Sequence, residues 1–318
     1  MNEKEKFGIV ITCYRGDIHF TKGLLASIFY FCGNVPICLI VDGDFSIKSL
    51  EKTYNIVRVI RKNDVQDDYL RNNCFGTRFS NMVAFFESPF ERFLYIDSDT
   101  VLWGNILDSF NPSSADFIYN EPHESYTPTI IKQQYFNFDR IFEYTENFEW
   151  NDCHFFNSGV FSMKRGIFNI EEVKELRQIC KTERSIMPTD VQGLLNICVF
   201  RNFKKNIITV SEAKLQTLTS CNKKEELERT FRIVNGTPLV EQNTVLHWAG
   251  LKPFYRQNKI FNEPMNFFRK MNLVYTNSKY RKTPYIYFRF EELKAIYNVY
   301  YKNRPIKIIL RLLGIKQY

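Results

Sequence analysis

Apolar runs and helical periodicities alternate along the first hundred residues of this chain. Four runs are almost wholly apolar, as strands buried on both faces of a parallel sheet are. These runs are Phe7–Cys13, Pro36–Val41, Ile56–Ile60 and Arg92–Ile96. Apolar residues at helical spacing separate them, at His19–Phe31, Ile47–Tyr54 and Gly76–Glu87. The alternation predicts an α/β fold with a doubly wound, mostly parallel sheet flanked by helices.

The rest of the chain continues this pattern less regularly. Strands are expected at Asp116–Tyr119, His154–Ser162, Ile207–Val210 and Thr244–Trp248, and helices at Ile170–Thr182 and Thr189–Phe200. The length of 318 residues suits one large α/β domain with an appendage. With 44% hydrophobic and 25% charged residues, the composition excludes a largely disordered chain.

The sequence carries no sign of export or of a membrane span. No stretch approaches the roughly 18 apolar residues of a transmembrane helix, and the acidic start MNEKEKFGIV lacks the apolar core of a signal peptide. We therefore expect a cytoplasmic protein. Its eight cysteines are scattered without a CxxC pair, which favours buried thiols over disulfides or a zinc site.

Positive charge is concentrated at the C-terminal end. Residues 270–318 hold eleven Lys or Arg and two Glu, although the net charge of the whole chain is only +8. Within RPIKIILRLLGIKQY, the side chains of Arg304, Lys307 and Arg311 recur on one face of a helix, with Ile and Leu around them. This pattern is typical of an amphipathic helix at an anionic membrane surface. No nucleic-acid-binding motif accompanies the charge, so we do not expect a nucleic-acid partner.

The stretch FLYIDSDTVL places Asp97 and Asp99 directly after the fourth apolar strand. Ligands of open α/β sheets bind beyond the carboxyl ends of the strands. Two carboxylates at i and i+2 repel each other there, and a divalent cation with oxygen ligands relieves the repulsion. A second DxD, from Asp42 to Asp44, follows the second strand without matching residues downstream, and we interpret it as a turn.

Two enzyme classes use this string. In GT-A glycosyltransferases a DxD motif holds Mn²⁺ or Mg²⁺ against the diphosphate of a nucleotide sugar. In HAD phosphatases the pattern DxDx[TV] supplies a nucleophile, here Asp97, and a general acid, here Asp99. A HAD enzyme also needs a later lysine and an acidic pair after a strand, and we find no convincing acidic pair after residue 100.

Three later segments, in this order, favour the first class: HFFNSGVFSM (154–163), PTDVQGLLN (188–196) and VLHWAGLKPF (245–254). Together with DSD they resemble glycosyltransferase family 8, the retaining GT-A enzymes of the glycogenin and bacterial lipopolysaccharide galactosyltransferase kind. The resemblance covers roughly residues 7–254. The third segment is one residue shorter than the family pattern and ends in Phe254 in place of Trp.

The resemblance implies a role for each matching residue. Asp97, Asp99 and His247 would ligate Mn²⁺ or Mg²⁺, and Lys252 would donate to the diphosphate of the donor. The resemblance assigns roles to five further residues. Gly250 would let the phosphates approach the backbone, Arg78 would lie near the donor phosphates and sugar, Asn157 and Gly159 would line the sugar, and Gln192 would match the glutamine of the family's D-Q pair. Asp190 precedes Gln192 by two positions rather than one, so its alignment is open.

The implied reaction transfers a hexose from a nucleoside-diphosphate sugar, by analogy UDP-galactose or UDP-glucose, with retention of configuration. The acceptor would be a glycan or lipid-linked glycan, as in lipopolysaccharide or capsule synthesis, at the inner face of the cytoplasmic membrane. We expect a catalytic domain at 1–254 and a basic extension at 255–318. The alternatives are a HAD-like phosphohydrolase and a non-catalytic membrane-associated relative.

Overall fold

The computed structural model describes residues 6–122, 127–141, 155–182, 185–188, 190–250, 252–254 and 259–297. The amphipathic helix expected around Arg304 lies outside the described residues, as does His154.

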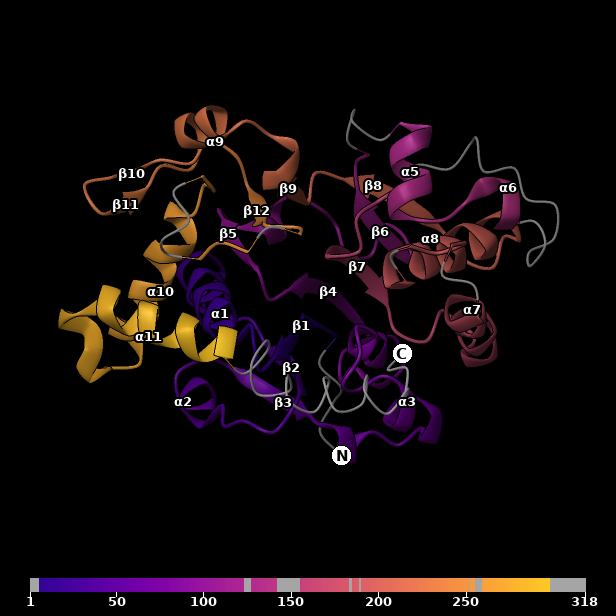
Figure 1. Cartoon of the computed structure of the whole chain (residues 1–318), viewed down its shortest axis with the longest axis horizontal. Coiled ribbons are helices and arrows are strands. Elements are labelled where there is room, and N and C mark those ends of the chain that lie inside the picture. The colour runs from indigo at the N-terminus through magenta and orange to yellow at the C-terminus, as the bar shows by residue number, and fades with distance from the viewer. Residues whose placement is uncertain are drawn as a thin grey trace, which may run out of the picture.

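A seven-stranded sheet forms the centre of the molecule, with the strand order β3-β2-β1-β4-β7-β6-β8 (Figure 1). The first four strands in sequence are parallel to one another, and β7 runs antiparallel to both of its neighbours, β4 and β6. The strands are β1 (Phe7–Tyr14), β2 (Ile37–Asp42), β3 (Ile56–Ile60), β4 (Arg92–Asp97), β6 (Phe117–Asn120), β7 (Val160–Lys164) and β8 (Val210–Ala213). The α/β class and the mostly parallel sheet are as expected.

Successive side chains of each strand point to opposite faces, so an apolar run supplies two cores at once. On β1, Val10 joins a cluster with the helices on one face, whereas Ile9 and Ile11 join the cluster on the other face. On β4, Tyr95 faces the first cluster and Ile96 the second. This two-sided burial explains why these strands lack polar alternation.

Helices cover both faces of the sheet (Figure 1). Helix α1 packs on one face together with α10, and α4, α7 and α8 pack on the other. The helices are α1 (Ile18–Cys32), α2 (Lys48–Glu51), α3 (Asp68–Asn73), α4 (Val83–Glu87), α5 (Pro128–Gln134), α6 (Phe138–Ile141), α7 (Ile170–Thr182), α8 (Asp190–Lys204), α9 (Lys224–Thr230), α10 (Glu263–Tyr275) and α11 (Pro284–Ile296).

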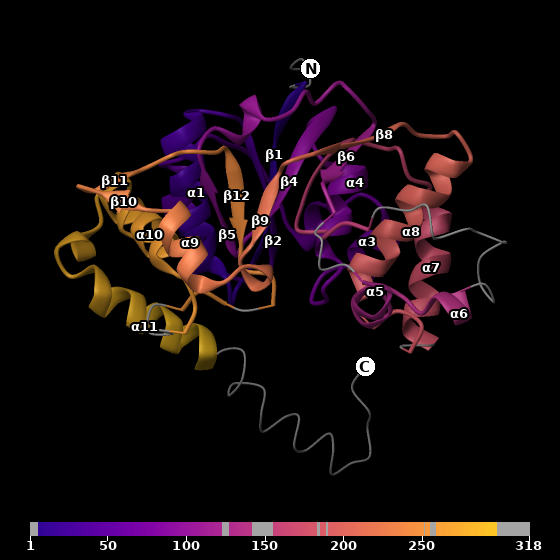
Figure 2. The ribbon, with the colours of Figure 1, turned by 90° about the horizontal axis from the view of Figure 1, so that it is seen from above.

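A second sheet of three strands, in the order β5-β12-β9, stands beside the carboxyl end of β4 (Figure 2). Its strands are β5 (Thr100–Trp103), β12 (Thr244–His247) and β9 (Gln216–Leu218), and a short hairpin of β10 (Ile233–Val234) and β11 (Thr237–Pro238) lies nearby. Only two residues separate β4 from β5, so the chain passes from one sheet to the other at Ser98 and Asp99. This junction positions the acidic pair.

Several expected elements differ in extent. The helix expected at 76–87 begins only at Ser80, because Gly76 has a positive φ of 73° and Asp42 accepts a hydrogen bond from its amide. The strand expected at 154–162 begins at Val160, because Asn157 forms a turn with Gly159. The strand expected at 207–210 shifts to β8, and the helix expected at 47–54 shortens to α2.

The chain beyond residue 254 continues with two helices on the α1 side of the sheet (Figure 1). Helix α10 packs closely on α1, where Met265 Sδ lies only 2.6 Å from the position that a Cβ on Gly23 would take. Arg269 of α10 pairs with Glu292 of α11 at 2.5 Å. Among the described residues, no helix combines the length and apolar character needed to cross a bilayer.

Candidate active site

The acidic pair is held rigidly at the junction between β4 and β5. The backbone amide of Asp97 donates to the Gly159 carbonyl at 2.8 Å, and its carbonyl accepts from Thr100 Oγ1 at 2.7 Å. The Asp99 carbonyl accepts from the Trp248 amide at 3.2 Å. The backbone of both aspartates is therefore held by hydrogen bonds to neighbouring segments.

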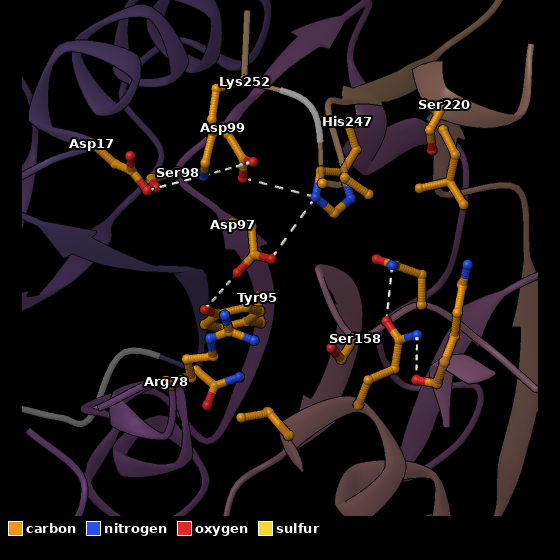
Figure 3. A pocket seen from close by; sticks show the side chains of 18 of the residues that line it. Asp17, Arg78, Tyr95, Asp97, Ser98, Asp99, Ser158, Ser220, His247 and Lys252 are labelled. Atoms are coloured by element: carbon orange, nitrogen blue, oxygen red, sulfur yellow. Dashed lines mark hydrogen bonds and ion pairs between the residues drawn. The ribbon is translucent and has the colours of Figure 1, made fainter. Parts of the chain in front are cut away.

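Strand pairing brings His247 to this pair from 150 residues further along the chain. β12 runs antiparallel to β5 with His247 opposite Thr100, the residue after Asp99. His247 Nε2 lies 3.8 Å from Asp97 Oδ2 and 3.8 Å from Asp99 Oδ1 (Figure 3). One ligand atom from each of the three residues lies within 4.8 Å of the others.

Each carboxylate uses one oxygen for a protein contact and turns the other toward His247. Tyr95 donates its hydroxyl to Asp97 Oδ1 at 2.9 Å, and Lys252 Nζ contacts Asp99 Oδ2 at 2.9 Å. The remaining oxygens, Asp97 Oδ2 and Asp99 Oδ1, face Nε2 (Figure 3). Two carboxylate oxygens and one imidazole nitrogen suit Mn²⁺ well, so these residues fit the expected divalent cation.

The two carboxyl groups differ in their electrostatic environment. Burial and the neighbouring Asp99 charge raise the pKa of Asp97 above its usual value. Burial also opposes ionisation of Asp99, but the Lys252 ammonium and His247 outweigh it and hold the pKa of Asp99 low. Because oxygens of the two carboxylates lie within 4.8 Å of each other, ionisation of both groups is unfavourable. A bound cation would remove that penalty.

Lys252 is held by a second carboxylate that the sequence did not reveal. Its Nζ lies 3.0 Å from Asp17 Oδ2 as well as 2.9 Å from Asp99 Oδ2. Burial alone would lower the pKa of Lys252, but the two carboxylates raise it, so the side chain is a cation. Asp17 follows β1, the parallel neighbour of β4, and the shared edge of parallel strands is the signal that could have found it.

Gly159 leaves room for the imidazole. A Cβ at this position would lie 2.2 Å from His247 Cε1 and 2.8 Å from Asp97 Oδ2. Asn157 Oδ1 accepts from the Gly159 amide at 2.9 Å, and Asn157 Nδ2 donates to Gln192 Oε1 at 3.0 Å. These contacts link helix α8 through Asn157 to Gly159, which lies against His247 and Asp97.

A cavity of about 1050 Å³ opens in front of these groups. Arg78, Asn157, Gln192 and Gly250 line it together with Asp97, Asp99 and His247. Arg78 is one of the lining side chains labelled in Figure 3 and is exposed to solvent. The volume is at the upper end of the range for small-molecule sites, so the cavity can take a ligand much larger than a simple phosphate ester.

Gly250 and Asp190 are the remaining residues predicted from the sequence. Gly250 has a positive φ of 81°, and nothing lies within 4 Å of the position that a Cβ would take. Its backbone conformation, rather than crowding by the protein, therefore favours glycine. Asp190 begins α8, and its side chain lies outside the described part of the structure.

The second DxD is a turn, as expected. Asp42 accepts from the Gly76 amide through both carboxylate oxygens, at 2.8 and 3.0 Å. Gly43 has a φ of 119°, and Arg61 donates to its carbonyl at 3.3 Å. Most of the described cysteines follow the expectation, because Cys13, Cys38, Cys74, Cys180 and Cys198 are buried, whereas Cys32 and Cys221 are half-buried.

Solved glycosyltransferases share this architecture. The galactosyltransferase LgtC, in complex with donor and acceptor sugar analogues, matches 83% of this chain and 95% of its own at a TM-score of 0.53 and 12% identity. The bifunctional glycosyltransferase WbbM matches 90% of this chain and 52% of its own, at a TM-score of 0.55 and 14% identity. The glycosyltransferase GlyE of Streptococcus pneumoniae TIGR4 matches 89% of this chain and 64% of its own, at a TM-score of 0.52 and 15% identity.

The chain therefore has the GT-A glycosyltransferase fold, which confirms the fold expected from the sequence. It is similar in structure to the family 8 galactosyltransferase LgtC. No protein-family model matches the sequence, and no curated protein matches it either.

Proposed function

We propose that this protein is a metal-dependent glycosyltransferase that moves a hexose from a nucleoside-diphosphate sugar, UDP-galactose or UDP-glucose, to a glycan or lipid-linked glycan. The observation that carries the proposal is the convergence of Asp97, Asp99 and His247 at one end of a large cavity in a GT-A fold. The DxD motif and His247 lie about 150 residues apart in the sequence but are neighbours in the structure. A DxD that occurs by chance would have no reason to be paired with such a histidine.

Each polar group has a place in the reaction. Asp97, Asp99 and His247 would hold Mn²⁺ or Mg²⁺, which would supply positive charge to stabilise the leaving diphosphate. Lys252, already cationic beside Asp99, donates to that diphosphate, and its ammonium opposes the same developing charge. Arg78 lines the same cavity and would lie near the donor phosphates and sugar, and Gly250 would offer exposed backbone to the phosphates.

Retention of configuration is proposed from the resemblance alone. Gln192 has both ends of its amide engaged, since Oε1 accepts from Asn157 and Nε2 donates to the Gln134 carbonyl at 3.4 Å. Such a fixed amide orients the sugar and is a poor nucleophile. We therefore favour front-side substitution, in which the acceptor hydroxyl attacks the anomeric carbon, the diphosphate leaves, and a phosphate oxygen takes the proton. Asp190 remains the alternative nucleophile.

The fold and the third ligand argue against a HAD-like phosphohydrolase. That mechanism needs Asp97 as a nucleophile, whereas Asp97 Oδ2 faces an imidazole and Oδ1 is held by Tyr95. A non-catalytic relative is disfavoured because the whole set of Asp97, Asp99, His247 and Lys252 is retained and assembled.

We further propose a catalytic domain at 1–254 and a basic extension at 255–318 that binds the inner face of the cytoplasmic membrane. Helix α11 supports this proposal, because Ile286, Phe290 and Leu293 form an apolar stripe that is 73%, 63% and 58% exposed. Exposed Arg289 and Lys294 lie next to the stripe on the same helix. An apolar stripe edged by cations fits an anionic lipid surface.

A donor screen tests the catalytic proposal. Hydrolysis of a panel of nucleotide sugars with Mn²⁺ should be selective for one donor and should stop on addition of EDTA. Asp97→Asn and Asp99→Asn should each reduce turnover by about 10²-fold or more, because each removes a charged ligand. Asp44→Asn, in the second DxD, is the matched control and should keep wild-type activity. Undiminished metal-dependent turnover in both ligand variants would refute the assignment.

A further inference from the structure

The buried side of His247 is occupied by a residue that no motif pointed to. Gln216 of β9 places its Oε1 2.8 Å from His247 Nδ1, on the opposite side of the ring from the two aspartates. His247 is 3% exposed and Gln216 is 8% exposed, so water does not compete for this contact.

The second end of the Gln216 amide determines which atom faces the imidazole. Gln216 Nε2 lies 3.5 Å from the backbone carbonyl of Asn157. A carbonyl oxygen only accepts hydrogen bonds, so the amide group that faces it must be the NH₂. The atom left for His247 is then the amide oxygen, which also only accepts. His247 Nδ1 must therefore donate, and in the neutral ring it carries the proton.

The strand keeps Gln216 in this orientation. The backbone N–H of Gln216 donates to Asn120 Oδ1 at 2.7 Å, and the backbone N–H of Leu215 donates to the same oxygen at 2.9 Å. β9 runs parallel to β12 with Gln216 paired to Val245, two residues before His247. Because side chains two residues apart point to the same face, the register directs Gln216 toward the imidazole.

We propose that Gln216 is a positioning residue that holds His247 in the Nδ1–H tautomer and keeps the Nε2 lone pair directed at Asp97 and Asp99. Without it, the two carboxylates favour a proton on Nε2, since Nε2–H would point at them. A proton there occupies the position that a cation needs. An outer partner that fixes the free nitrogen is what orients a metal-binding histidine. This inference deepens the proposed function, and only the statement that His247 binds a cation rests on that function.

The tautomer can be measured without metal, donor or acceptor. The chain has four histidines, so selective ¹⁵N labelling gives few signals, and His247→Gln assigns the one of interest. At a pH where the ring is neutral, wild-type Nδ1 should give the protonated, pyrrole-type resonance and Nε2 the pyridine-type resonance. In Gln216→Leu the pattern should reverse, and in Gln216→Glu, which keeps an acceptor oxygen, it should be restored.

Metal affinity gives the second readout. Titration of Mn²⁺ followed by electron paramagnetic resonance should show affinity about 10–100-fold weaker in Gln216→Leu than in wild type. Gln216→Glu should retain most of the affinity. Thr217→Val is the matched control, because it removes the 3.1 Å hydrogen bond between Thr217 and Thr244 in the same strand pair without touching His247. It should leave affinity and tautomer unchanged.

The outcomes separate this inference from the proposed function. A pyridine-type Nδ1 in the wild type, or an unchanged tautomer in Gln216→Leu, overturns the inference. Equal loss of affinity in Thr217→Val and Gln216→Leu also overturns it, because strand pairing would then explain the effect. If the wild type has the expected tautomer but binds no Mn²⁺, the role of Gln216 in setting the tautomer stands and the proposed metal chemistry fails.

Discussion

At the scale of single residues, the site depends on atoms that turn away from the metal position as much as on those that face it. Asp97 and Asp99 each give one oxygen to a neighbour, Tyr95 or Lys252, so that the other oxygen points at His247. The direction of each candidate ligand atom is thus set by a hydrogen bond that the other oxygen of the same carboxylate makes.

Gly159 provides a sharp test of this arrangement. Gly159→Ala would place a methyl group 2.2 Å from His247 Cε1, so the imidazole must move away from the carboxylates. We expect a folded protein, destabilised by about 1–3 kcal/mol through overpacking. Mn²⁺ affinity and transfer should both fall by at least about tenfold, measured by metal titration and donor turnover.

Gly236→Ala is the control for a general loss of stability. Gly236 has a φ of 77° and open space around its Cβ position, so alanine there meets backbone strain without a steric clash. This variant should be less stable than wild type but should bind Mn²⁺ normally. A Gly159→Ala protein with wild-type affinity would mean that His247 is not a ligand.

At the scale of elements, α11 presents two distinct faces. Its inner side buries Phe288, Glu292 and Ala295, and Glu292 pairs with Arg269 of α10 at 2.5 Å. Its outer side carries the exposed stripe of Ile286, Phe290 and Leu293. The helix lies on the outside of α10 in both views (Figures 1 and 2).

Membrane binding through this stripe can be tested by flotation with vesicles. Phe290→Glu should weaken binding to vesicles that contain anionic lipid, because it places a charge in the apolar stripe and opposes the lipid charge. Glu228→Gln on α9 is a surface control and should float as wild type does. Turnover of a soluble donor should be unchanged in both variants, and equal flotation of Phe290→Glu and wild type would contradict the proposal.

At the scale of the whole molecule, ligand binding should appear as thermal stability. A ligand that binds only the folded chain at 100 times its Kd adds about 2.7 kcal/mol. For a chain of this size that corresponds to a rise in Tm of roughly 4 °C. We expect this rise with UDP and Mn²⁺ together and a much smaller one with UDP and EDTA. Equal shifts in the two cases would show that the diphosphate is not held through the cation.

Much of the architecture was predictable from local sequence. The apolar composition of the first four strands was enough to predict them. The rule that ligands bind at strand ends was enough to single out the acidic pair at the end of β4. The predicted boundary of a helix was wrong where a single polar contact overrides the apolar periodicity. This is the case at Gly76, whose backbone amide donates to Asp42, far earlier in the chain. The order of motifs also predicted that His247 and Lys252 belong with the acidic pair, and the structure brings them together.

The sequence by itself determined the elements and the chemical types of the ligands, because apolar periodicity and strand-end position are properties of short segments. Only the tertiary structure decided which atoms of those ligands face inward. Asp17 and Gln216 act through contacts between distant segments of the chain, and the register between β9 and β12 selects Gln216. A one-residue slip in that register would turn Gln216 or His247 to the opposite face, and no short segment encodes that choice.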